Sequence, residues 1–140
     1  MELRRVVVTG LGALTPIGNN IQEYWHGLLN GVSGAAPITY YDTEKHKTKF
    51  ACEVKNFNIE NYMDRKESRR LDKFAQYAIA ASDEAIKDAG LTDDNIDKQR
   101  VGVIWGAGIG GLETFQDEVM YYAKGDGTPK FNPFFIPKMI

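Results

Sequence analysis

The sequence has few of the features that define special classes of protein. It holds a single cysteine, Cys52, so no disulfide can form within the chain, which agrees with a reducing compartment. No run approaches the roughly 20 continuous apolar residues that a membrane helix needs, and Met1–Arg5 leads into a short strand-like run instead of a secretory leader. The 17 basic residues are balanced by 19 acidic ones, and a net charge of -2 gives no electrostatic case for a nucleic-acid or membrane-surface protein. We therefore expect a cytoplasmic protein that binds neither nucleic acid nor membrane.

The composition that is present fits an ordinary folded domain. Of the 140 residues, 43% are apolar and 26% are charged, which lies inside the range of globular proteins. A self-contained domain of this length can bury a sizeable core. The sequence contains no internal repeat and no low-complexity segment.

The chain shows the same order of elements twice: a short β-branched run, a glycine-rich turn and a helical pattern. Val6–Val8 and Val101–Trp105 are the two runs, and each is typical of a strand buried on both faces of a parallel sheet. After the first turn, Asn19 or Asn20 can cap a helix. The second turn leads into a helix that ends near Ala123. We therefore predict two buried strands, each followed by a helix.

The strongest helical pattern runs from Lys73 to Ala89 and ends at Gly90, as a C-cap glycine should. One face carries small and apolar residues, namely Phe74, Ala78, Ala81, Ala85 and Ala89, widened by Ile79 and Ile86. So many alanines on one face predict close approach to other backbone, as in the central helix of a larger core.

The remaining segments show weaker patterns. The first helix has an apolar face through which we expect it to pack, made of Ile21, Trp25, Leu28 and Leu29. Residues 33–48 follow neither period and indicate an excursion loop. Phe50–Val54 alternates and predicts a short, partly exposed strand.

The spacing of the glycines in the second turn suggests a dinucleotide-binding site. Gly106, Gly108 and Gly111 satisfy the G-x-G-x-x-G spacing, and Asp126 lies downstream. The acidic residue must end a second parallel strand, whereas Asp126 lies in a turn with no strand before it. Neither glycine turn ends in the Gly-Lys-Ser/Thr of a phosphate-binding loop. We therefore expect no nucleotide cofactor, and tight strand-to-helix turns are the simplest meaning of these glycines.

The residues that could ligate a metal or act as nucleophiles are isolated. His26 flanks the first helix and His46 lies in a charged run, with no Cys, Asp or Glu at ligand spacing, so we expect no metal site. Cys52 alternates with charged neighbours and precedes no helix, which favours a half-buried structural residue over a nucleophile.

Four cations recur at helical spacing. Lys66, Arg69, Arg70 and Lys73 stand at i, i+3, i+4 and i+7, which predicts that they share one helical face. Most such stripes are merely solvated, and the spacing alone leaves open whether this one binds a partner.

Seven segments, taken together and in order, carry a resemblance to a known family: Arg4–Gly12, Thr15–Asn19, Tyr41–Thr43, Lys49–Ala51, Arg65–Asp72, Gly106–Gly111 and Pro133–Pro137. They resemble the 3-oxoacyl-[acyl-carrier-protein] synthases of type II fatty acid synthesis. The resemblance covers the whole chain and is nearer to the class II enzymes that elongate long acyl chains than to the initiating class III enzymes.

The resemblance implies a fold and a reaction. Family members are α/β homodimers of thiolase-like architecture, with α-β-α-β-α layers, and residues 1–140 would form an incomplete N-terminal part of that domain. They join an acyl chain to malonyl-acyl carrier protein by decarboxylative Claisen condensation, an acyltransferase reaction without a metal or nucleotide cofactor. Their cysteine nucleophile and two histidines lie beyond the position of Ile140, so we expect these residues alone to be inactive.

The resemblance also implies roles for individual residues. Gly108 and Ile109 would belong to the acyl pocket, with Ile109 as its gate, and Phe135 and Ile136 would close the acyl tunnel of the partner subunit. Without the resemblance, the sequence favours a core residue at Ile109, and two phenylalanines between prolines are equally typical of a core. Lys66, Arg69 and Arg70 would receive the acidic helix of acyl carrier protein.

One alternative within the resemblance stays open. A non-catalytic partner of a condensing enzyme, similar to a chain-length factor, would keep this fold and interface but lack the nucleophile. A free-standing interaction domain is a further alternative, which the alanine-rich helix and the apolar segment from Phe134 to Ile140 argue against.

Overall fold

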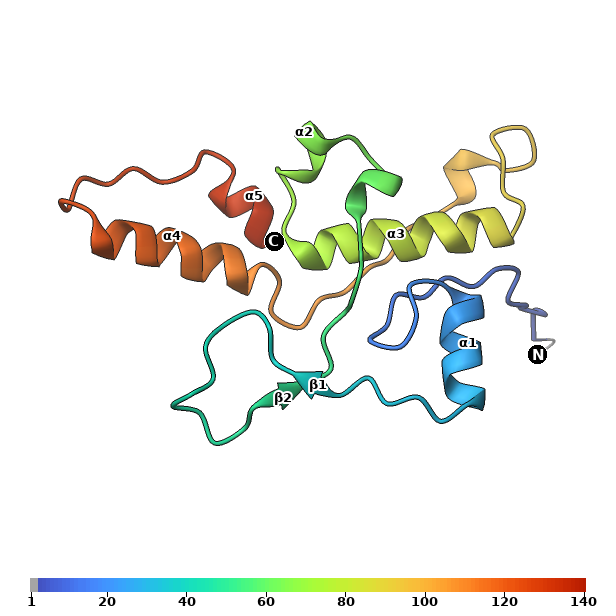
Figure 1. Ribbon diagram of the computed structural model, residues 1–140. Helices are drawn as coiled ribbons and strands as arrows, with labels where there is room; N and C mark the ends of the chain where they lie inside the picture. Colours follow the sequence, from blue (N-terminus) through green and yellow to red (C-terminus); the bar gives the residue numbers. More distant parts are fainter. Residues whose placement is uncertain (1–2) are drawn as a thin grey trace. The chain divides into compact units, whose positions relative to one another are not determined.

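The computed structural model describes residues 3–140 (Figure 1). Its elements in chain order are α1 (Ile21–Leu29), β1 (Ala36–Pro37), β2 (Phe50–Ala51), η1 (Ile59–Asn61), α2 (Arg65–Ser68), α3 (Lys73–Asp88), η2 (Lys98–Arg100), α4 (Leu112–Lys124) and α5 (Phe135–Met139). The chain divides into two compact units. The first contains the residues up to Asn58 together with Ala80–Ile96, and the second contains Ile59–Ile79 together with Asp97–Ile140.

The first unit is built on close contact between α3 and the glycines of the first turn. An added Cβ at Gly10 would lie 2.6 Å from the backbone nitrogen of Ala89, and one at Gly12 would collide with the carbonyl oxygen of Ala81. Ala80 and Ala81 are buried. The alanine face therefore receives other backbone, as the sequence predicts, because neither partner carries a side chain that would hold the two apart. Gly90, with φ +61°, ends the helix as expected.

Two carboxylates of α3 hold the segment that lies against it. Glu84 accepts from the backbone N–H of Ala13 at 2.9 Å and from that of Ile21 at 2.8 Å, and Asp88 accepts from Leu11 N–H at 2.8 Å. Ile21 is the first residue of α1, so Glu84 satisfies one of the donors that a helix start leaves without a partner. The two acceptors stand four residues apart, one turn along the same side of α3.

Helix α1 forms where the sequence predicts, but it packs through a different side. The Asn20 side chain accepts from Glu23 N–H at 2.8 Å, which makes Asn20 the N-cap. Trp25 and Leu29 are 60% and 67% exposed, so the expected apolar packing face is wrong. Gly27 is the buried residue, and the Ile17 carbonyl lies 3.1 Å from where its Cβ would be. The preceding loop packs on the helix there because glycine offers no side chain.

A two-stranded antiparallel sheet joins β1 to β2, with Ala36 opposite Ala51 and Pro37 opposite Phe50. The expected strand over Phe50–Val54 is thus confirmed only at its start, and the predicted loop over 33–48 contains its partner strand, β1. Cys52 follows β2 and is exposed, not half-buried as expected. The backbone turns away after two pairs, which leaves the thiol in solvent.

Beyond this sheet, Thr39 donates from its hydroxyl to Glu53 at 2.8 Å. That hydrogen bond, aided by the Thr39 N–H, holds the pKa of Glu53 below its ordinary value of 4.5. The stabilising contribution of Glu53 is therefore present above its ordinary pKa and is lost as the pH falls through the lowered one.

The two runs that the sequence predicts as buried strands are not strands in the structure. Val6 is 89% exposed and Ile104 is 97% exposed, and among residues 3–140 the strands are β1 and β2. The reason is physical: a β-branched run has the propensity for a strand, but a strand exists only when a second backbone pairs with it. Neither Val6–Val8 nor Val101–Trp105 has such a partner in the described part of the chain.

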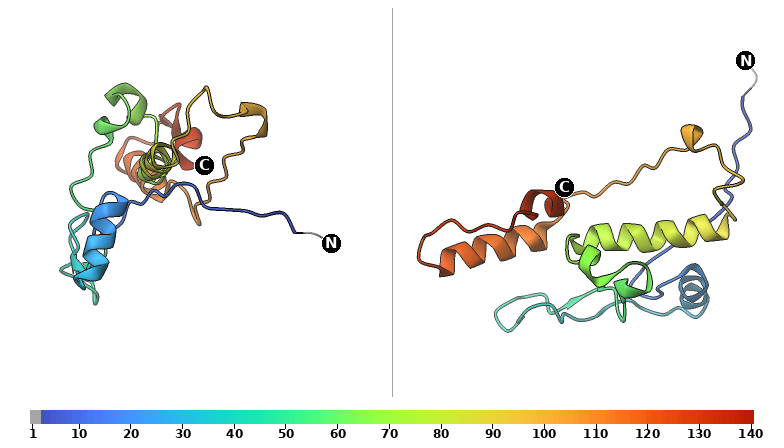
Figure 2. Two further views of the ribbon diagram at one scale, coloured as in Figure 1. Left: turned by 90° about the vertical axis from the view of Figure 1, so that its right-hand side faces the viewer. Right: turned by 90° about the horizontal axis from the view of Figure 1, so that it is seen from above.

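Within the second unit, α4 and α5 pack against each other, which the views from two further directions show (Figure 2). Across residues 3–140, each helix is too short or too polar to cross a lipid bilayer.

A Gly12→Ala substitution tests the contact between the first turn and α3. The new methyl group would meet the Ala81 carbonyl, and we expect the free energy of unfolding of the whole protein to fall by about 1–3 kcal/mol. Urea denaturation measures the change. Gly125→Ala is the matched control, because Gly125 has a negative φ and its added Cβ would find its nearest neighbour at 3.4 Å. Equal stability of the two variants would contradict the packing.

Candidate functional site

The second unit contains every residue that the sequence singles out for the acyl pocket and for carrier docking. These residues are Lys66, Arg69, Arg70, Gly108, Ile109, Phe135 and Ile136. They stand on three segments: α2 with the turn after it, the glycine turn before α4, and α5.

The cations after residue 65 do not share one helical face, so that prediction is wrong. Lys66 lies in α2, Arg69 is its C-cap, and the helix breaks before Lys73 begins α3. The turn between the helices is held by the Gln76 amide, which donates to the carbonyl of Ser68 at 3.0 Å and to that of Leu71 at 3.1 Å.

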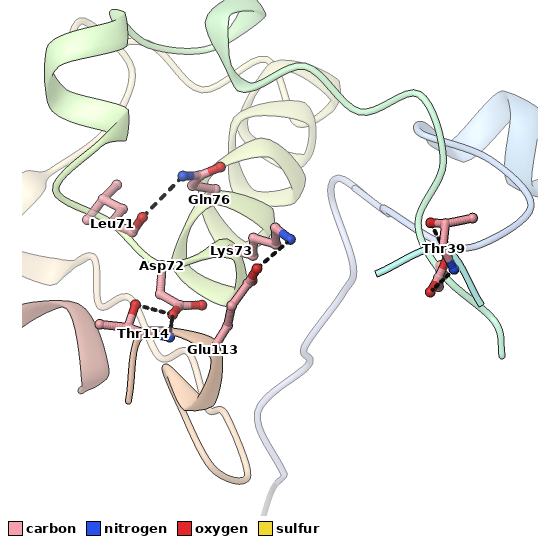
Figure 3. A network of polar contacts seen from close by, with 8 residues as sticks. Thr39, Leu71, Asp72, Lys73, Gln76, Glu113 and Thr114 are labelled. Atoms are coloured by element: carbon pink, nitrogen blue, oxygen red, sulfur yellow. Dashed lines mark hydrogen bonds and ion pairs between the residues drawn. The ribbon is translucent and has the colours of Figure 1, made fainter. Parts of the chain in front are cut away.

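Lys73 is removed from the group by an ion pair. Its ammonium lies 3.0 Å from the Glu113 carboxylate, which neutralises its charge locally (Figure 3). Lys66, Arg69 and Arg70 are exposed and remain together around the end of α2.

The helix breaks because Asp72 is engaged elsewhere. Its backbone carbonyl accepts from the N–H groups of Ala75 and Gln76 and so starts α3. Its side chain accepts from the backbone N–H of Thr114 at 3.1 Å and from the Thr114 hydroxyl in a short hydrogen bond (Figure 3). Asp72 and Thr114 are 7% and 8% exposed, so these bonds are shielded from water.

Asp72 thereby caps α4 from a distant part of the sequence. Thr114 is the third residue of α4, whose own N-cap, Gly111, has no side chain to accept a hydrogen bond. A carboxylate at this place satisfies an orphan donor and lies at the positive end of the helix dipole. The start of α3 and the start of α4 are therefore fixed to each other.

The glycine turn lies against the end of α5. Gly111 N–H donates to the Met139 carbonyl at 2.9 Å, and an added Cβ at Gly111 would lie 2.6 Å from the Lys138 carbonyl. Gly110 has φ +77°, a conformation that favours glycine. Of the three glycines at fingerprint spacing, Gly111 is thus explained by close packing, as the simpler meaning predicts, whereas an added Cβ at Gly106 or Gly108 would find open space.

The pocket residues are brought to this same region with different exposure. Ile109 is 76% exposed on the turn, and an added Cβ at Gly108 would find open space. Ile136 is 55% exposed on α5. Phe135 is half-buried, and its ring stacks on those of Phe115 at 6.3 Å and Phe131 at 5.9 Å between centroids.

One contact joins a cation that the sequence assigns to carrier docking to the segment that holds two of the expected pocket residues. The Arg70 guanidinium lies 5.0 Å from the centroid of the Phe134 ring, next to Phe135 in the chain. The sequence gives no signal for it, because the two residues are far apart and follow no common pattern. The Asp72–Thr114 pair is also missed, although a glycine at a helix start indicates that the cap must come from elsewhere.

A polar hollow of about 340 Å³ lies beside these segments. Its lining includes Arg69, Lys73, Glu113, Asp117 and Lys138, but none of the residues expected in the acyl pocket. Because its charged groups are of both signs, it does not offer the apolar walls that an acyl chain needs.

The chain is similar to proteins of one known family. The family described as "Beta-ketoacyl synthase, N-terminal domain" matches residues 3–140. The 3-oxoacyl-[acyl-carrier-protein] synthase 2 of Staphylococcus aureus (strain N315) is 49% identical over 138 residues, which are 98% of this chain and 33% of the relative. The chain spans about a third of the length of the curated relatives it matches.

Two solved structures contain a similar fold. The ishigamide ketosynthase/chain length factor has a TM-score of 0.88 and 33% sequence identity, covering 98% of this chain and 34% of that one. A type II PKS acyl-carrier protein in complex with its ketosynthase bound to the hexaketide has a TM-score of 0.74 and 25% identity, covering 96% and 34%. The likeness confirms the expected fold class, part of a thiolase-like α/β fold.

Replacement of Asp72 by alanine tests the capping bridge. The change leaves the N–H and hydroxyl of Thr114 buried without their acceptor, and we expect unfolding of the whole protein to become easier by about 1–3 kcal/mol. Thermal or urea unfolding reads out the loss. Asp94→Ala removes an equal charge from an exposed position and should cost less than about 0.5 kcal/mol. The bridge would be refuted if the two variants unfold alike.

Proposed function

This chain belongs to the beta-ketoacyl synthase family, and from that membership we propose that it forms the N-terminal third of an elongating 3-oxoacyl-[acyl-carrier-protein] synthase. The observation that carries the proposal is the 49% identity to the Staphylococcus aureus synthase, which extends over 98% of this chain. The protein would act in the cytoplasm, in type II fatty acid synthesis.

The proposed reaction lengthens an acyl chain by two carbons. A malonyl thioester loses carbon dioxide, the resulting carbanion attacks the carbonyl of an acyl thioester, and the thiol leaves to give a 3-oxoacyl thioester. Cys52 does not serve as the nucleophile, because it is exposed beside a two-residue strand and not at a helix start, where a dipole favours thiolate. The residues of this chain would therefore contribute by binding the carrier protein and by shaping the acyl pocket.

The acyl pocket is proposed to include Gly108, Ile109, Phe135 and Ile136. The packing of Gly111 on Met139 supports this assignment, because it holds the turn that carries Ile109 against α5. The exposed side chains of Ile109 and Ile136 remain available to an acyl chain. In a homodimer, Phe135 and Ile136 would close the tunnel of the partner subunit.

Lys66, Arg69 and Arg70 are proposed to dock acyl carrier protein. All three are exposed around the end of α2, and Lys73, which pairs with Glu113, is not part of the group. The likeness to a ketosynthase solved with its acyl-carrier protein supports such a partner. Exposed ion pairs are weak and screened by salt, which suits a carrier that must leave after each turnover.

The alternative of a non-catalytic partner is not favoured. The structural relative named ketosynthase/chain length factor is 33% identical, whereas the Staphylococcus aureus relative, at 49%, is named a synthase.

A reconstituted condensation assay with the whole protein tests both function and docking. We expect condensation of acyl and malonyl groups carried on acyl carrier protein, and a roughly tenfold rise in KM at low salt for the double variant K66E/R69E, because two exposed attractions become repulsions. The control K45E/K47E reverses as many charges in a solvated loop. Absence of condensation by the wild type would refute the function; equal KM values for the two double variants would refute the docking.

An Ile109→Phe variant tests the pocket. The larger ring at an exposed pocket position should shorten the acyl chains that the whole protein accepts, with long-chain kcat/KM falling roughly tenfold and short-chain kcat/KM nearly unchanged. Product chain lengths measured by mass spectrometry show the effect. An unaltered profile would remove Ile109 from the pocket.

A further inference from the structure

Arg70 differs from the other two docking cations in what its side chain contacts. Its guanidinium lies 5.0 Å from the Phe134 ring centroid, inside the roughly 6 Å over which a cation is attracted to a ring face. Neither Lys66 nor Arg69 makes such a contact within residues 3–140. Phe134 is 40% exposed, so the contact is partly shielded from water.

The backbone on the Arg70 side of the contact is held firmly. Arg70 N–H donates to the Glu67 carbonyl at 2.9 Å. The Gln76 amide binds carbonyls on both sides of Arg70 in the chain, those of Ser68 and Leu71, and the buried Asp72 follows at once. Arg70 therefore extends from a turn that has little freedom to move.

The Phe134 side of the contact is the start of α5. Phe134 is the N-cap of this helix, and its carbonyl accepts from Lys138 N–H at 2.9 Å. Its own N–H donates to the Asn132 side chain at 2.8 Å. Phe135 and Ile136 are the next two residues, so a displacement of Phe134 displaces both of them.

Helix α5 depends on such contacts for its position. It has five residues, far fewer than a helix needs to be stable by itself. At its end, Met139 accepts from Gly111, and at its start the ring stack of Phe135 and the cation over Phe134 fix it. Loss of the contact with Arg70 removes the restraint on the Phe134 ring and leaves the start of α5 with the ring stack of Phe135 and the hydrogen bonds to Asn132.

We propose that Arg70 is a positioning residue which, through the ring of Phe134, sets the placement of Phe135 and Ile136 and thereby the acyl-chain lengths that the pocket accepts. The inference rests on the proposed function, because it assigns to one docking cation a second task in the same enzyme. A single side chain then serves the carrier surface and the acyl pocket.

The test separates positioning from docking by the choice of substrate. Short, medium and long saturated acyl groups are supplied to the whole protein as N-acetylcysteamine thioesters, which lack the acidic helix that docking requires. The readout is the ratio of kcat/KM for long chains to that for medium chains. We expect Arg70→Gln and Phe134→Leu each to change this ratio roughly two- to fivefold. The double variant should change it no further, because both single changes remove one interaction.

Conservative variants and a charge control complete the design. Arg70→Lys keeps a cation and Phe134→Tyr keeps a ring, so both should retain most of the wild-type ratio. Arg65→Gln removes the same charge from the neighbouring helix, where Arg65 faces Glu60 at 3.8 Å, and should leave the ratio unchanged. If Arg70→Gln fails to fold, the difference between Phe134→Leu and Phe134→Tyr decides the question.

Each outcome bears on the inference in a defined way. An unchanged ratio in Arg70→Gln, additive effects in the double variant, or equal ratios for Phe134→Leu and Phe134→Tyr would leave Arg70 as a docking residue alone. A wild type that condenses no thioester, on the small or the natural carrier, would instead overturn the proposed function. The two failures are thus distinguished by the wild-type measurement.

Discussion

The hydrogen bonds from Thr114 to the Asp72 carboxylate are the interaction on which the second unit depends. Asp72 starts α3 with its backbone and caps α4 with its side chain, so one residue fixes two helix starts. The glycine turn leads into α4, so the Asp72–Thr114 bonds also fix the position of this turn. Helix α5 packs on the turn and is positioned with it. A buried acceptor serves this purpose because an unsatisfied donor at a helix start would cost more than any exposed ion pair returns.

The first unit obeys a related constraint, although its contacts are of another kind. Gly12 meets the backbone of α3 where alanines leave room, and Glu84 accepts from two backbone donors of the segment that lies there. In both units, carboxylates satisfy backbone N–H groups that no sheet reaches, and glycines let the backbones approach. The chain is held by caps and close contacts more than by the burial of large side chains, since Ala80 and Ala81 are the buried apolar residues of the described part.

In the proposed site, too, one side chain serves two purposes. Arg70 is exposed enough to meet a carrier protein, yet its guanidinium also lies over Phe134 at the start of α5. A guanidinium can serve two surfaces in this way because a ring covers only one face of the planar group, while the N–H donors at its edge stay accessible. In the proposed function, Arg70 belongs to the carrier surface and Phe135 to the acyl pocket, and the contact of Arg70 with Phe134 would bring the two close together within one unit.

The sequence by itself determined the local elements and the family. Helices α1, α3 and α4, the Asn20 cap and the Gly90 terminus follow from periodicity and capping chemistry, which act between near neighbours. Only the tertiary structure decided which partners meet. It broke the cation stripe at Asp72, exposed the β-branched runs that lack a pairing strand, and placed Arg70 over Phe134. No sequence period encodes such contacts, because they join residues that are distant in the chain and depend on where whole segments pack.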